Sequence, residues 1–165
     1  SMNAKQKLLL ISGVMLVPVA LAYGVIPQFS MQFLYSIEVN DVNTTHVFRA
    51  LMGLYLFQAV LFLAGALIKR LTDAALYSLI IFMAGLATGR ALSLAIDGTP
   101  NWLMVVFLVV EVVIVLVAIS LLLMPKSKSV EAKSEQPVEI SQERPEEAHP
   151  QETPAADEDS SSQKP

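Results

Sequence analysis

The sequence predicts an all-α membrane protein, a four transmembrane helix bundle with a disordered C-terminal tail. Three observations lead to this fold class. Four long apolar stretches recur before residue 125, basic residues flank them on alternate sides, and the composition changes sharply after residue 124. We therefore treat residues 1–124 as the bundle and residues 125–165 as a separate segment.

Each apolar stretch is long enough to cross a bilayer, whose ~30 Å core requires about 20 apolar residues in a helix. The predicted spans are residues 8–26, 47–68, 74–96 and 102–124. The first span also resembles a signal peptide, because Lys5 and Lys7 precede an apolar run that reaches Ala20-Leu21-Ala22. The run continues to residue 26, which favours a retained helix. Cleavage of residues 1–22 would leave three spans in the same orientation.

The charges that flank the spans predict the orientation. Lys5 and Lys7 precede the first span, Lys69 and Arg70 join the second to the third, and two lysines follow the fourth. The other two connections, residues 27–46 and 97–101, contain no Lys or Arg. By the positive-inside rule, both termini face the cytoplasm.

The first outer connection is predicted to carry structure of its own. Phe29, Phe33, Leu34 and Ile37 recur with helical spacing, which suits a short helix in the headgroup region or a loop packed on the mouth of the bundle. Asn43-Thr44-Thr45 is predicted to cap the second span.

The segment after residue 124 has a different composition from the bundle. It holds six of the nine prolines and ten of the fifteen acidic residues, with few large apolar side chains. Such a segment cannot bury enough apolar surface to fold, so we predict disorder. It would serve as a solvated tether or as an arm that binds a partner.

Several functional classes are disfavoured by composition. The chain has no cysteine and only two histidines, which excludes disulfides and thiolate chemistry and disfavours a metal site or paired haem ligands. No catalytic residues, metal or cofactor are predicted, and the expected partner is the lipid bilayer rather than nucleic acid.

Charged residues inside the spans mark the candidate site, because an ionisable group in lipid needs a partner or a function. Glu111 lies in an otherwise apolar span, while Arg90 and Asp97 lie near the outer end of the preceding one. Measured from the turn between these spans, Arg90 and Glu111 differ in depth by only ~6 Å, and their side chains lean toward each other. We predict an Arg90–Glu111 ion pair whose remaining N–H groups are shared by Ser93 or Asp97.

Further polar residues in the outer half extend this prediction to a pocket that opens outward. The full candidate set is Arg49, Tyr55, Gln58, Arg90, Ser93, Asp97 and Glu111. The pocket would hold a small polar or anionic group between the two arginines. Alternatively, the charges only neutralise one another and lock the helices together.

Small residues in the third span predict close helix contacts. Gly85 and Gly89 have the GxxxG spacing that lets two helix backbones approach. The contact would lie within the bundle, with a partner membrane protein or in a homo-oligomer.

These residues resemble a known family. The strings are Phe48-Arg49-Ala50-Leu51-Met52-Gly53-Leu54-Tyr55, Gly89-Arg90-Ala91-Leu92-Ser93-Leu94 and Asp97-Gly98-Thr99-Pro100, followed by Glu111. Together they are similar to an uncharacterised bacterial family of small four-helix integral membrane proteins, a domain of unknown function that is DoxX-like in size and layout. The resemblance covers roughly residues 8–124 and implies a bacterial inner membrane location, but no reaction or ligand.

Three functions follow as hypotheses. The first is a non-enzymatic binding module or accessory subunit with the buried polar cluster. The second is a small transporter that uses Glu111 as a proton or ion carrier. The third, which the DoxX-like layout implies, is a quinone-linked membrane enzyme subunit.

Overall fold

The computed structural model describes residues 1–125, so the predicted disordered tail lies outside the described residues. The chain forms five α-helices and one 3-10 turn in this part. In order they are α1 (Ala4–Gly24), α2 (Pro27–Tyr35), α3 (Val42–Leu67), η1 (Lys69–Leu71), α4 (Thr72–Ile96) and α5 (Trp102–Leu123). Within residues 1–125, four helices are long and apolar enough to cross a membrane, which confirms the predicted four-helix bundle.

Two of these helices, α1 and α3, begin about one turn earlier than the apolar pattern predicts, because polar residues cap them. Asn3 and Gln6 form a reciprocal capping box at the start of α1. At the start of α3 the Asp41 side chain accepts a hydrogen bond from the Thr44 backbone N–H. The Thr44 hydroxyl also donates to the Asp41 carboxylate and lowers the pKa of that group. The predicted cap at residues 43–45 is therefore wrong: these residues lie in the first turn of α3, and Asp41 is the cap.

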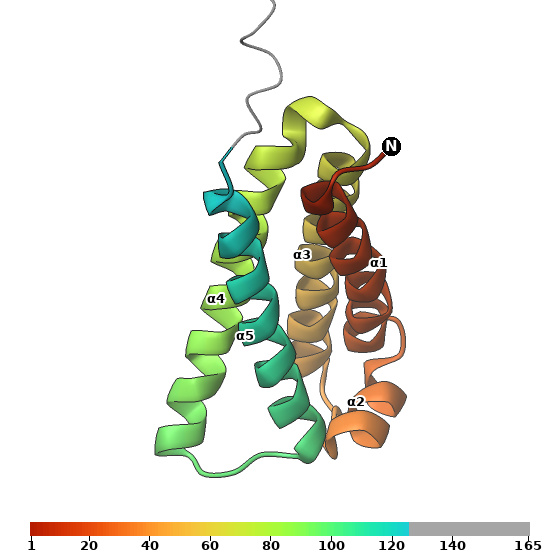
Figure 1. Ribbon diagram of the computed structural model, residues 1–165. Coiled ribbons are helices and arrows are strands. Elements are labelled where there is room, and N and C mark those ends of the chain that lie inside the picture. The colour runs from red at the N-terminus through yellow and green to blue at the C-terminus, as the bar shows by residue number, and fades with distance from the viewer. Residues whose placement is uncertain (126–165) are drawn as a thin grey trace, which may run out of the picture. The chain divides into compact units, whose positions relative to one another are not determined.

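The bundle consists of two hairpin-like pairs, α1 beside α3 and α4 beside α5 (Figure 1). Glycines permit the closest approaches. A Cβ atom on Gly65 of α3 would lie 2.2 Å from the Cβ of Ala75 on α4, and one on Gly24 of α1 would lie 2.5 Å from the Cβ of Met52. Backbones this close leave no room for a side chain, so these positions require glycine.

Gly85 and Gly89 differ from these glycines. A Cβ atom added at either position would meet nothing within 4 Å. The GxxxG pair is thus not used for a close contact within the described part of the chain. Its use between chains stays a prediction.

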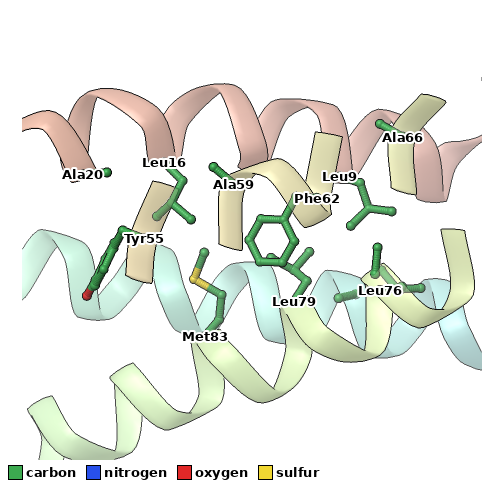
Figure 2. Packing of buried hydrophobic residues seen from close by; sticks show 12 residues of the cluster. Leu9, Leu16, Ala20, Tyr55, Ala59, Phe62, Ala66, Leu76, Leu79 and Met83 are labelled. Carbon is green, nitrogen blue, oxygen red and sulfur yellow. The ribbon is translucent and has the colours of Figure 1, made fainter. Parts of the chain in front are cut away.

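The apolar core lies where α1, α3 and α4 meet (Figure 2). Phe62 of α3 is fully buried between Leu9 of α1 and Leu79 of α4, as Figure 2 shows. In contrast, α5 buries only Glu111 and Ala118 among its own residues. Most of the apolar surface of α5 is therefore available to lipid.

The connection between α1 and α3 contains the predicted short helix, α2, at the end of the bundle that also holds the α4–α5 turn (Figure 1). We call this the α2 end. Met31 and Tyr35 of α2 pack into the bundle, whereas Phe29 and Phe33 are 69% and 77% exposed and stack on each other. The exposed aromatic pair suits the headgroup region of a bilayer.

Candidate functional site

The centre of the site is an ion pair between two membrane-spanning helices. The Arg90 Nε of α4 donates to the Glu111 Oε1 of α5 across 3.0 Å, which confirms the predicted pair. The guanidinium carbon of Arg90 also lies 5.7 Å from the centroid of the Phe107 ring, one turn from Glu111 on α5. Glu111 is only 6% exposed, so its carboxylate is buried away from lipid and needs the arginine beside it.

A cavity of about 200 Å³ lies against this ion pair. All four spanning helices contribute to its walls, which are mostly apolar. The lining residues include Tyr55 of α3 and Met83 of α4, beside Arg90 and Glu111 themselves. Its charged groups are only these two, so the formal charge of the lining is zero.

The exposed rim of this cavity lies on α1 and α5. Ile11 and Met15 of α1 are 57% and 56% exposed, and Val110 of α5 is also exposed at the surface. Because both helices are membrane spans, an opening between them faces the acyl chains of the bilayer. This differs from the sequence prediction of a pocket that opens outward.

Two buried side-chain oxygens, each on a residue that lines this cavity, have no hydrogen-bond partner among residues 1–125. They are Oε2 of Glu111 and the hydroxyl oxygen of Ser12 on α1. Ser12 and Glu111 are 3% and 6% exposed, so neither atom can bond with solvent at the molecular surface. Buried polar groups nearly always have a hydrogen-bond partner, so two unpartnered oxygens on residues of one cavity are a specific feature of this site.

Aromatic side chains fill the bundle on the α2 side of the cavity. The Tyr23 ring contacts those of Tyr35, Phe48 and Tyr55 at centroid distances of 6.2, 6.2 and 5.1 Å. The Tyr35 ring lies 6.4 Å from that of Phe107. Burial, reinforced by the neighbouring Tyr23, raises the pKa of Tyr35 above its ordinary range, so this hydroxyl stays neutral at physiological pH.

The structure divides the remaining predicted site residues between separate locations. Gln58 of α3 donates to the Ser78 hydroxyl of α4 at 2.6 Å. The Ser93 hydroxyl donates to Asp97 at 2.7 Å on an exposed part of α4. Ser93 and Asp97 thus bond to each other, and within residues 1–125 no hydrogen bond joins either residue to Arg90.

Arg49 lies outside the cavity as well. It is exposed and lines a different hollow near the start of α3, together with His46 and Asp41. A ligand between Arg49 and Arg90 is therefore not supported by this geometry. The sequence could not show the separation, because the rotation of an almost wholly apolar helix about its axis is not fixed by its pattern.

The sequence pattern did not identify Ser12 and Phe107 as parts of the site. A single serine in an apolar span resembles the small residues that merely permit helix packing. Phe107 resembles every other large apolar residue of α5. The sequence signal for Phe107 was its position four residues before Glu111, on the same helical face.

Residues 1–125 contain no group of three His, Cys, Asp or Glu placed to hold a metal ion.

Together, the fold and this site define a multi-pass α-helical membrane protein with an ion pair inside the bundle. The chain belongs to the family described as a domain of unknown function (DUF4345), whose model matches residues 4–122. This match confirms the resemblance to a family of unknown function. Neither the curated proteins nor the solved structures contain a match to the chain.

Proposed function

We propose that the protein is a non-enzymatic binding module or accessory subunit of the bacterial inner membrane, and that it holds a small molecule in the cavity beside Arg90 and Glu111. The observation that carries this proposal is the unpartnered oxygen of Glu111, a residue that lines the cavity. A pair that served only to lock two helices would gain by satisfying both oxygens within the protein. A cavity lined mainly by apolar groups with few polar ones is also typical of small-molecule sites.

Ligand occupancy can be tested on the intact protein. We expect membranes that contain the wild-type chain to yield a co-purifying small molecule, identified by mass spectrometry of an organic extract. Ser12→Phe would fill the cavity from α1 and should remove that molecule. Val14→Phe is the matched control, because Val14 is exposed on the same helix and does not line the cavity.

The two variants distinguish binding from carry-over of bulk lipid. Bulk lipid would be recovered equally from both, whereas a bound ligand would be depleted only in Ser12→Phe. Equal recovery of every extracted molecule from the wild type and both variants would contradict the proposal.

Transport is a second candidate function. Glu111 is the only buried carboxylate in residues 1–125, and it lines a cavity. A carrier of protons would be neutral for part of its cycle, so Glu111→Gln would be stable and inactive. A binding module in which Arg90 depends on the carboxylate predicts an unstable variant instead.

The proposed location has both termini in the cytoplasm and the α2 end outside. The chain lacks cysteine, so single cysteines can report this orientation. We expect Thr99→Cys to react with a membrane-impermeant maleimide in intact cells, and Pro125→Cys to react only after permeabilisation. The reverse labelling pattern would overturn the orientation.

Association with a membrane protein or a second copy through Gly85 and Gly89 is also part of the proposal, since no atom of the described chain lies within 4 Å of a Cβ added at either glycine.

A further inference from the structure

The unpartnered oxygens of two residues that line the cavity restrict the chemistry of the ligand that it can hold. An ionised carboxylate oxygen only accepts hydrogen bonds, so Oε2 of Glu111 requires a donor. The Ser12 hydroxyl both donates and accepts. A ligand head that carries a donor and an acceptor in one group satisfies both atoms. A hydroxyl group is the smallest head with this property.

Charge restricts the ligand further. Arg90 already donates to Oε1 of Glu111, and no other charged residue lines the cavity. An anionic head would face the free carboxylate oxygen in a low-dielectric site, and a cationic head would add a net charge to a neutral lining. The walls therefore favour a neutral head.

Shape and access define the rest of the molecule. A cavity of roughly 150 Å³ accommodates benzene, so the 200 Å³ here holds a head with a short apolar stem. The exposed rim at Ile11, Met15 and Val110 leads into the acyl-chain region, where a longer apolar tail would lie. Entry from the bilayer requires no passage through water.

From these observations we infer that the cavity binds a neutral, hydroxyl-bearing amphiphile from the bilayer, whose hydroxyl bonds to Oε2 of Glu111 and to Ser12. The inference rests on the proposed binding function and adds the class of ligand. Of the small polar or anionic group that the sequence suggested between the two arginines, it keeps the polar group and excludes the anionic one.

The test uses the full chain in nanodiscs of phosphatidylcholine. The probe is a hexadecanol that carries a photoreactive diazirine in its chain, and labelled residues are mapped by mass spectrometry. The competitors share one tail and differ in the head: hexadecanol, its methyl ether, hexadecanoic acid and hexadecylamine. We expect labelling of α1 and α5 residues on the cavity rim, with hexadecanol displacing the probe at the lowest mole fraction.

Variants test the two hydrogen-bonding atoms. Ser12→Ala removes one hydrogen bond, so we expect hexadecanol to compete about threefold to tenfold less well. Ser120→Ala is the matched control: this serine lies on an exposed part of α5, and its hydroxyl donates to the Leu116 carbonyl. In the control, displacement should equal that of the wild type. Met15→Trp, which narrows the rim without touching either polar atom, should reduce labelling by all probes.

Each outcome decides a separate point. Equal competition by the methyl ether would overturn the requirement for a donor. Stronger competition by the acid or the amine would overturn the neutral head, while leaving the cavity as a binding site. An unchanged response in Ser12→Ala would remove that serine from the site and overturn the inference. If no rim residue shows labelling that a competitor displaces, both the ligand class and the proposed binding function fail.

Discussion

Replacing either Arg90 or Glu111 alone is expected to lower the free energy of unfolding by about 3–5 kcal/mol, because each change leaves a charged or polar partner unmatched in a buried site. The variants are Arg90→Leu and Glu111→Gln, studied by SDS titration in mixed micelles. The double variant should recover much of the loss, since the stranded arginine is gone. The recovered energy measures the coupling across the 3.0 Å contact.

A second ion pair in the same chain supplies the control. Lys5 and Asp73 lie 2.9 Å apart near the opposite end of the bundle, and the Asp73 side chain is 57% exposed. Exposed pairs contribute only about 0–1 kcal/mol, so Lys5→Met should have a small effect. If the Arg90 and Glu111 variants are additive, the two residues do not depend on each other. A stable, inactive Glu111→Gln would then favour transport.

Gly65→Ala is the second change with a large expected effect. The added methyl group would lie 2.2 Å from the Cβ of Ala75 and 3.2 Å from Leu9, so α3 and α4 must separate. Overpacking of this kind typically lowers stability by about 1–3 kcal/mol. Alanine is a better helix former than glycine by about 1 kcal/mol. A loss of stability in Gly65→Ala would therefore come from packing and not from helix propensity.

Two further variants make this prediction specific. Gly85→Ala has the same change in helix preference and nothing within 4 Å of the new methyl group. It should be neutral or stabilising by up to about 1 kcal/mol. Ala75→Gly combined with Gly65→Ala should restore part of the loss, because it removes the opposing Cβ. Equal unfolding midpoints for Gly65→Ala and Gly85→Ala would contradict the close packing of α3 on α4.

The ion pair was predictable from sequence because the two residues lie at one depth and the cost of an unpaired charge in lipid turns them toward each other. Arg90 and Glu111 lie at similar distances along the chain from the turn at residues 97–101. Their depth in the bundle follows from these distances, however each helix is rotated about its axis. The number of spans was predictable for a similar reason, since it depends on the length of the apolar runs.

The rest of the site depends on rotation about the helix axis. Ser12 faces the cavity and Ser93 does not, although both are serines in apolar helices. An amphipathic pattern would have fixed these faces, but lipid and core are both apolar, so the sequence carries little rotational information. Arg49 was grouped with Arg90 by depth, yet its side chain lies in another hollow.

The position of the ion pair on consecutive helices has a consequence for biosynthesis. An arginine at the centre of an inserting helix opposes transfer of the helix from the translocon by about 2.5–3.5 kcal/mol, and each Leu, Ile, Val or Phe favours transfer by about 0.3–0.6 kcal/mol. Arg90 lies nearer the end of α4, so its cost is smaller but has the same sign. The helix α5 consists almost entirely of such residues, so their favourable transfer offsets the cost of inserting Glu111. The helix α4 contains Arg90 among several small residues and gains less. Because residues 97–101 are all that separate the two helices, Glu111 is translated soon after Arg90. When α4 and α5 insert together as a helical hairpin, Arg90 and Glu111 enter the bilayer as a pair. Insertion of either helix alone would leave an unpaired charge there.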